Sequence, residues 1–280
     1  MAERLRALAG ALSALGLFAA APAAAAPAPA RVVSINLCTD ELLIRLGDRS
    51  QAAGVTWLST LSAGSNVADE VRGIPATHGF AEQVIGLRPD LVLAGRYTSR
   101  QSVAVLRRIG VPVVDADAPR TLDGVREEIR RVAQAIGHVD RGEAMIAELD
   151  RRLSRAVAAR EPKLRAAVLR PNGFSAGPGS LTDELMRRAG LVNVVAELEL
   201  DHYGQLPLEL VIAKGIDLLI VDGDRAGPPA MATEMLRHPA LLRLGDRVKV
   251  ARVPPKLWTC AGPSLADAFD ILADAAEAPR

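Results

Sequence analysis

Short apolar runs alternate with amphipathic stretches along most of the chain. Several of the apolar runs are continuous and rich in β-branched residues, which is typical of parallel strands buried on both faces. They predict strands at 31–35, 53–56, 91–94, 111–115, 166–169, 218–221 and 248–253. Helical periodicity predicts helices between them, such as 39–46, 100–109, 181–189 and 265–275. This alternation predicts an α/β fold built from βαβ units.

The segment 121–160 lacks any apolar run typical of a strand. Its first half carries an apolar stripe formed by Val125, Ile129, Val132 and Ile136. Its second half carries another, formed by Met145, Leu149, Leu153 and Val157. Gly137 and Asp140 separate the two helices, so we expect the second helix to run from 140 to 160. A helix of that length reaches about 30 Å, enough to run the length of a small protein.

The sequence on either side of this helical segment repeats itself. Glu82 opens the stretch EQVIGLRPDLVL, and Glu209 opens the stretch ELVIAKGIDLLI. Any helix–turn–strand unit looks broadly like this, but the matching positions in the two halves favour two similar lobes. We therefore expect an N-terminal lobe at 31–139, a connecting helix at 140–160 and a C-terminal lobe at 161–280.

The first 25 residues have the order of a secretory signal peptide. Arg4 and Arg6 precede an Ala- and Leu-rich run over 7–21, and small residues follow at 23–25. A membrane anchor is the alternative, but it needs about 20 strongly apolar residues, and here prolines follow the run closely. We expect cleavage after Ala25 and a soluble mature protein in the periplasm.

Charge argues against a nucleic-acid partner. The chain has 34 basic and 33 acidic residues, a net charge of +1, whereas nucleic-acid binding normally demands a basic face. No enzyme or metal centre is apparent either. The four histidines lack H-E-x-x-H spacing, and the Gly-rich stretch 173–180 lacks a nucleophile elbow and a Walker lysine. We therefore expect no catalytic residue, no metal site and no cofactor.

Aromatic residues are scarce and lie mostly in loops. Outside the signal peptide and the last predicted helix there are six: Trp57, Phe80, Tyr97, Phe174, Tyr203 and Trp258. Four of them follow predicted strands directly, and the carboxyl ends of strands form the ligand crevice of open α/β sheets. Six separate half-buried rings are the alternative interpretation. We favour a shared pocket, three rings from each half, which suits a bulky, flat or chelate-like ligand.

Three motifs agree in order with those of a known family. They are RVVSINLCTDELL at 31–43, LRPDLVLA at 87–94 and GVPVV at 110–114. The mature chain thereby resembles the periplasmic substrate-binding proteins of ABC importers for iron-siderophores and cobalamin, the class with a helical backbone. The resemblance implies two Rossmann-like lobes joined by a long connecting α-helix, with the ligand held between them and only limited hinge motion.

The resemblance also implies roles for individual residues. In the family, one glutamate on each lobe docks onto arginines of the membrane permease, and Glu82 and Glu209 match that pattern. Glutamates that complement a helix dipole are the alternative interpretation. Four further residues fall near pocket positions of cobalamin-type binders: Trp57, His78, Tyr203 and Trp258.

Three more candidates complete the expected ligand site. Arg96 and Tyr97 follow the strand at 91–94, and Phe174 is a ring from the second half. An arginine at the cleft edge binds an anionic chelate bidentately, although a solvated surface arginine is an equal alternative. Cys38 and Cys260 lie in loops of different halves. A disulfide between them would tether the lobes, but two free thiols is the interpretation we favour.

The resemblance implies a monomeric carrier that delivers a small-molecule metal chelate to the transmembrane permease of an ABC transporter. The chelate is a ferric siderophore or cobalamin; the shortage of clustered arginines disfavours a strongly anionic siderophore. Haem is an alternative ligand, since Tyr97, Tyr203 or His78 offers an axial ligand. A ligand-free envelope adaptor or sensor of the same fold is a second alternative.

Overall fold

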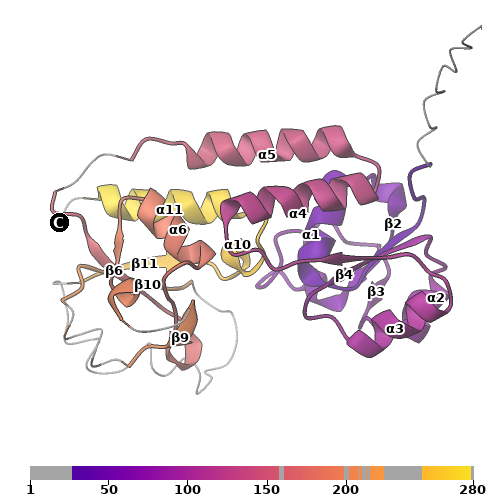
Figure 1. The fold of residues 1–280 in the computed structure, drawn as a ribbon, viewed down its shortest axis with the longest axis horizontal. Coiled ribbons are helices and arrows are strands. Elements are labelled where there is room, and N and C mark those ends of the chain that lie inside the picture. Colours follow the sequence, from indigo (N-terminus) through magenta and orange to yellow (C-terminus); the bar gives the residue numbers. More distant parts are fainter. Residues whose placement is uncertain are drawn as a thin grey trace, which may run out of the picture.

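Two parallel sheets lie at opposite ends of an elongated molecule in the computed structural model (Figure 1). The structure describes residues 27–157, 161–198, 202–207, 209, 213, 215–223 and 248–278. The first sheet has the strand order β3-β2-β1-β4-β5, and the second has the order β11-β10-β6-β8. The predicted α/β fold of two lobes is confirmed. The expected signal peptide, residues 1–25, lies outside the described residues.

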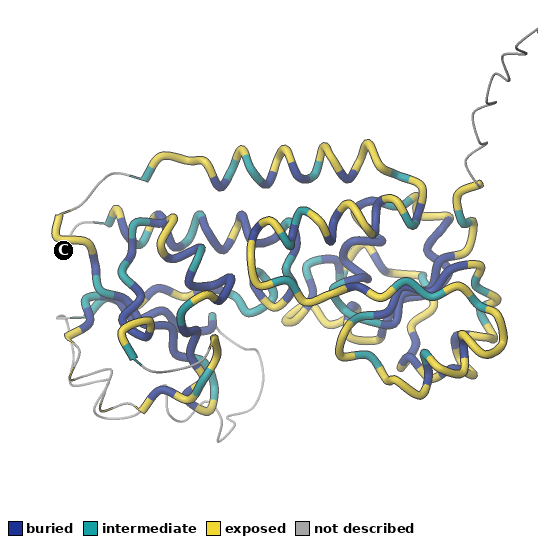
Figure 2. The backbone as a smooth tube through the Cα atoms, in the orientation of Figure 1, coloured by how far each residue is buried: buried dark blue, intermediate teal, exposed yellow. Residues whose placement is uncertain are grey.

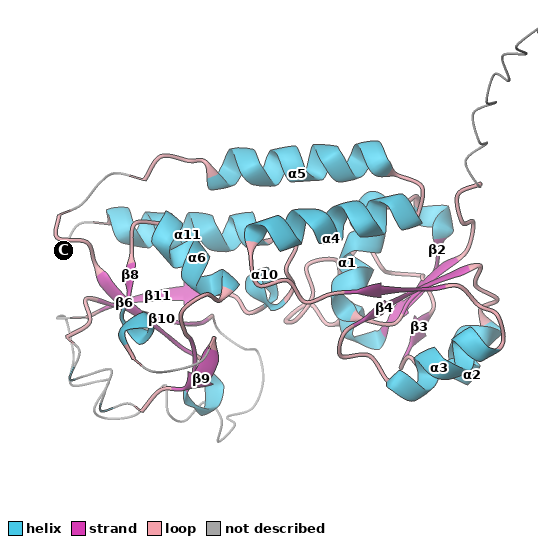
Figure 3. Ribbon diagram, in the orientation of Figure 1, coloured by secondary structure: helices cyan, strands magenta, loops and turns pink. Residues whose placement is uncertain are grey.

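The N-terminal sheet is buried on both faces. Its strands are β1 (Val32–Ser34), β2 (Ala52–Thr56), β3 (Ala76–Thr77), β4 (Leu91–Gly95) and β5 (Val113–Ala116). Its helices are α1 (Leu37–Leu46), α2 (Ala81–Gly86) and α3 (Arg100–Arg108). Val32 and Leu93 pack towards α1, whereas Val33 and Val92 pack in a separate cluster with residues of α2 and α3. Figure 3 shows α1 on one side of this sheet and α2 and α3 on the other. Alternating side chains thus fill two cores, which explains the continuous apolar runs.

The C-terminal sheet is built in the same way. Its strands are β6 (Arg165–Leu169), β8 (Val192–Asn193), β10 (Leu218–Asp222) and β11 (Lys249–Val253). The helices α6 (Leu181–Arg188) and α11 (Leu265–Glu277) supply the core on the face of Val168 and Ile220. An antiparallel pair, β7 (Phe174–Ala176) and β9 (Tyr203–Gln205), and the short helix α10 (Lys256–Thr259) complete the described part of this lobe. Short 3₁₀ segments occupy Arg49–Gln51, Trp57–Thr60, Pro171–Gly173 and Val194–Glu197.

Two helices, α4 (Leu122–Ala135) and α5 (Val139–Leu153), lie between the sheets in the sequence. They run antiparallel, and α5 lies over both α4 and α11, with its buried residues facing them (Figure 2). The expected helix end at residue 160 is wrong, because the helix ends at Leu153. Val157 packs against the C-terminal core outside the helix instead of continuing the stripe. Residues 158–160 lie outside the described residues.

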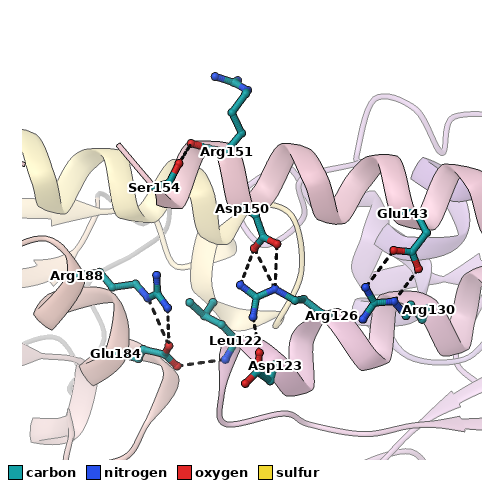
Figure 4. Close-up of polar contacts among 10 residues, drawn as sticks. All are labelled: Leu122, Asp123, Arg126, Arg130, Glu143, Asp150, Arg151, Ser154, Glu184 and Arg188. Carbon is teal, nitrogen blue, oxygen red and sulfur yellow. Dashed lines mark hydrogen bonds and ion pairs between the residues drawn. The ribbon is translucent and has the colours of Figure 1, made fainter. Parts of the chain in front are cut away.

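Ion pairs hold these two helices to each other, and a helix-end hydrogen bond holds α4 to the C-terminal lobe (Figure 4). Arg126 of α4 binds Asp150 of α5 through Nε at 3.0 Å and Nη2 at 2.6 Å. Arg130 likewise binds Glu143 at 2.6 and 3.0 Å. Figure 4 also shows the carboxylate of Glu184, in α6 of the C-terminal lobe, accepting the first backbone N–H of α4 at 3.2 Å.

Cys38 and Cys260 form a disulfide, so the expectation of two free thiols is wrong. Their Cα atoms lie 5.1 Å apart, although 222 residues separate them in the sequence, and that proximity comes from the packing of the two lobes. Cys38 lies in the first turn of α1, and Cys260 directly follows α10. Beside the bridge, the Asn66 amide donates to the carbonyl of Lys256 at 2.8 Å, a second link between the lobes.

The sequence echo corresponds to a structural repeat. The carboxylate of Asp90 accepts the backbone N–H of Arg31, just before β1, at 2.9 Å. The carboxylate of Asp217 accepts the backbone N–H of Arg165, the first residue of β6, at 3.0 Å. Asp90 directly precedes β4, which pairs with β1, and Asp217 directly precedes β10, which pairs with β6. Each aspartate therefore fixes the start of the strand that pairs with the strand it precedes. Most of the second echoed helix lies outside the described residues, and the exact domain boundaries stay a prediction.

Candidate ligand-binding cleft

A cavity of about 590 Å³ lies between the lobes and is lined by residues of both. The N-terminal lobe contributes residues that follow β4 and β5, and the C-terminal lobe contributes Arg170 after β6, Tyr203 of β9 and Trp258 of α10. Much of the lining thus comes from segments at the carboxyl ends of parallel strands, as the topology favours. The volume falls within the roughly 300–1,000 Å³ typical of small-molecule sites.

Four of the predicted ligand residues line this cavity: Arg96, Tyr97, Tyr203 and Trp258. The side chain of Tyr97 is 84% exposed and that of Tyr203 is 50% exposed, so both rings are available to a ligand. Trp258 is buried, and the guanidinium of Arg170 lies 4.6 Å from its ring centroid, a favourable cation–π arrangement. Arg96 pairs with Asp117 at 3.1 Å.

The other predicted residues lie elsewhere. Trp57 and His78 do not line the cavity; their ring centroids are 5.6 Å apart, and Phe80 lies 6.1 Å beyond His78. All three side chains are exposed. Phe174 is on the antiparallel β7–β9 pair, and the strand register puts it on the same face as Tyr203. The six rings therefore do not line the single shared pocket that we expected from the sequence, because only Tyr97, Tyr203 and Trp258 of the six line this cavity.

A buried carboxyl fixes the base of the Trp57 segment. Asp40 of α1 accepts hydrogen bonds from the backbone N–H of Thr56 at 3.1 Å and from its hydroxyl at 2.5 Å. Burial, which destabilises the ionised form, raises the pKa of Asp40 to about 7. Thr56 is the residue directly before Trp57, so Asp40 holds the start of the 3₁₀ turn that presents the tryptophan.

Arg170 and Glu128 are two of the lining residues that were not predicted. Arg170 directly follows the strand predicted at 166–169, so the strand-end rule applies to it as well. Glu128 lies on α4, on the face of the apolar residues Val125 and Val132. A carboxylate on a buried stripe is itself a signal in the sequence, and burial raises the pKa of this carboxyl.

The described lining of the cleft offers oxygen and nitrogen atoms that can bind a metal, but these residues form no assembled metal site. Within the ranges that the structure describes, no group of three or more His, Cys, Asp and Glu side chains is placed to hold a metal ion. Tyr97 and Tyr203 line the cavity, as does His202, whose Nδ1 lies 2.9 Å from the carbonyl of Pro178. No helix in the described part of the chain is long and apolar enough to cross a membrane.

The two predicted docking residues belong to different lobes. Glu82 lies in the first turn of α2, and Glu209 follows the β9 segment; both side chains are exposed. In Figure 1, α2 and β9 lie on the side of the lobes that faces away from α5. This arrangement leaves both carboxylates open to a partner.

Comparisons with known proteins agree with this architecture. The sequence model of a family described as periplasmic binding protein matches residues 32–247. A cobalamin-binding protein of Halobacterium salinarum is 29% identical over 234 residues, which cover 79% of this chain and 63% of that relative. The chain therefore spans less than two thirds of the length of the curated relatives that it matches.

Solved structures show the same fold. The periplasmic haem-binding protein RhuT from Roseiflexus sp. RS-1 has a TM-score of 0.65 at 24% identity, over 88% of this chain and 98% of its own. A periplasmic haem-binding protein from Pseudomonas aeruginosa has a TM-score of 0.71 at 22% identity, over 89% and 93% of the two chains.

Proposed function

The chain belongs to the periplasmic binding protein family, and we propose that it captures a metal chelate between its lobes and delivers it to an ABC permease. The observation that carries this proposal is the cavity between the lobes, lined by Tyr97, Tyr203 and Trp258 from both sides. Aromatic rings provide large, stiff contact surfaces for a flat ligand. The family consists of substrate-binding transport proteins rather than enzymes, and we propose no catalytic activity.

A corrinoid of the cobalamin type is the chelate that we favour over a ferric siderophore. Two of the three arginines that line the cleft have acidic neighbours, Asp117 at 3.1 Å from Arg96 and Asp222 at 3.9 Å from Arg170. A cleft in which most of the positive charge is compensated suits a neutral ligand better than a strongly anionic one. The likeness to relatives named as cobalamin-binding proteins supports the same choice.

The remaining predicted residues enlarge the proposed site beyond the cavity. Phe174 and Tyr203 share one face of the antiparallel β7–β9 pair, so both rings are available to one ligand. Arg96 lies at the edge of the cleft. Trp57 and His78 form an exposed aromatic surface on the N-terminal lobe. We assign these two residues to the part of a large ligand that projects from the cavity.

A haem carrier is the second candidate function. Tyr97 and Tyr203 belong to different lobes and both line the cavity, and a tyrosine oxygen is an established axial ligand of haem iron. His78, the third axial candidate from the sequence, lies outside the cavity with Trp57. The likeness in fold to two periplasmic haem-binding proteins supports this second candidate. A ligand-free adaptor of this fold is the remaining alternative.

Delivery requires a docking surface, for which we propose Glu82 and Glu209. Two exposed carboxylates, one on each lobe, can position the carrier on a permease with two-fold symmetry. They would do so through charge-assisted hydrogen bonds to arginines of the permease. The proposal places the mature protein in the periplasm as a monomer, after removal of residues 1–25. It includes no nucleic-acid partner.

Isothermal titration calorimetry of residues 26–280 tests the proposed function. The panel consists of cyanocobalamin, haemin and several ferric siderophores. We expect one of these chelates to bind at one-to-one stoichiometry, and binding to weaken when Tyr97 and Tyr203 are both replaced by alanine. Failure of every chelate to bind would contradict the proposal and favour the ligand-free adaptor.

A further inference from the structure

Two buried polar atoms in the lining of the cleft have no hydrogen-bond partner within the described part of the chain. They are Oε1 of Glu128, a hydrogen-bond acceptor, and Nε1 of Trp258, a donor. Both residues line the cavity, and they are 4% and 7% exposed. Burial of a polar atom without a hydrogen-bond partner is destabilising, so each of these atoms marks a position where a group of the ligand can supply the missing hydrogen bond.

The carboxyl of Glu128 is held by its other oxygen. Oε2 accepts the backbone N–H of Asp117 at 3.0 Å and lies 3.4 Å from Nη1 of Arg131. These two contacts come from the loop after β5 and from the next turn of α4. Because one oxygen is fixed from two sides, the position of Oε1 is fixed as well, and it is pre-organised as an acceptor.

Trp258 is held on the opposite lobe. The guanidinium of Arg170 covers one face of its ring at 4.6 Å, and the short helix α10 that carries it is tied to the N-terminal lobe by the adjacent disulfide. Its indole N–H has no acceptor capacity. The cleft therefore presents one fixed acceptor from the N-terminal side and one fixed donor from the C-terminal side.

We propose that Glu128 selects the ligand by its hydrogen-bond donors: Oε1 accepts an N–H group from the edge of the chelate. Trp258 Nε1 then donates to a carbonyl oxygen of the same edge. Carboxamides supply both groups, whereas a carboxylate satisfies Trp258 but places its lone pairs against Glu128. The inference rests on the proposed function and narrows the substrate class to neutral chelates with amide groups around the ring.

Glutamine at position 128 tests this assignment. In Glu128→Gln the side-chain carbonyl still accepts the Asp117 N–H, and the amide NH₂ takes the place of the free acceptor. Glu127→Gln is the matched control, because Glu127 is the exposed neighbour on the same helix. The probes are cyanocobalamin, which has carboxamides at its edge, and haemin, which has carboxylates. Titrations at about pH 8, above the usual pKa range of a glutamate, favour the ionised carboxyl, which only accepts hydrogen bonds.

We expect wild-type protein to bind cyanocobalamin more tightly than haemin. Glu128→Gln should weaken cyanocobalamin binding about tenfold, the effect of leaving one buried group unsatisfied, without weakening haemin binding. Glu127→Gln should match wild type. Trp258→Phe, which keeps a ring but removes the N–H, should weaken cyanocobalamin binding even if Glu128→Gln fails to fold.

Other outcomes overturn the inference in distinguishable ways. If Glu128→Gln binds cyanocobalamin as tightly as wild type, the inference is wrong and these side chains have a purely structural role. The same conclusion follows from unchanged affinity in Trp258→Phe if only that variant folds. Tighter wild-type binding of haemin would reject selection for amides and leave the chelate carrier standing. If neither cyanocobalamin nor haemin binds, this inference is overturned. The proposed function is overturned as well only if every chelate of the panel fails to bind.

Discussion

The disulfide between Cys38 and Cys260 joins the two lobes beside the ligand cleft, and Cys38 itself lines the cavity. The polypeptide already crosses between the lobes through α5, so the bridge adds a second covalent crossing at a different place. The Asn66 amide, bonded to the carbonyl of Lys256 at 2.8 Å, reinforces it. Together these links favour a carrier whose lobes move little.

Removal of the bridge should destabilise the protein. In Cys38→Ser with Cys260→Ser, we expect the free energy of unfolding to fall by about 2–5 kcal/mol, since a disulfide that closes a long loop restricts the unfolded chain. Urea denaturation followed by circular dichroism measures this. Thiol counting on the denatured, unreduced protein is the direct check. Two free thiols would refute the bridge.

Asp40 should make stability depend on pH. Burial raises its pKa to about 7, above that of an unfolded aspartate, so its contribution is greatest at low pH and is lost as the pH rises through about 7. Asp40→Asn stays neutral and keeps an acceptor for Thr56. This variant should resemble wild type below about pH 4 and exceed it by up to a few kcal/mol at about pH 8.

Urea denaturation at a series of pH values measures this difference. Asp69→Asn, which changes an exposed carboxylate in an ion pair with Arg72, should follow the wild-type curve. Parallel curves for Asp40→Asn and wild type would contradict the assigned pKa.

The docking proposal predicts a separation of binding from transport. Glu82→Ala combined with Glu209→Ala should leave chelate affinity unchanged, because neither side chain lines the cavity, and should abolish uptake. Uptake of labelled chelate by cells that carry the importer measures this. Glu70→Ala with Glu127→Ala removes two other exposed carboxylates as the control. Weaker chelate binding in the first pair, or unimpaired uptake, would reject the assignment.

The sequence predicts the fold well where one pattern dominates. The strands at 91–94, 166–169 and 218–221 are continuous apolar runs because both faces are buried, and the structure places strands there. The antiparallel pair of β7 and β9 was missed because each strand has only three residues, too few to show a pattern, and the two are far apart in the sequence. The helix at 140–160 was too long because apolar spacing alone continues through Val157.

The candidate site could be predicted only in part. Arg96, Tyr97 and Trp258 follow strands, so the strand-end rule brings them to the cleft. Glu128 was not predicted because the strand-end rule does not apply to a helix, although its place between Val125 and Val132 on the apolar face of α4 was a signal in the sequence. The pairing of Cys38 with Cys260 depends on how two lobes meet, which no local pattern encodes.

Hydrogen–deuterium exchange with and without bound chelate tests the central claim most directly. The ligand is cyanocobalamin, or haemin if that is the chelate that binds in calorimetry. The account predicts protection on both sides of the cleft, at 95–98 and 116–120 in one lobe and at 202–205 and 256–261 in the other. Saturating chelate that leaves these segments unprotected, or protects only the surface around Trp57 and His78, would contradict binding between the lobes.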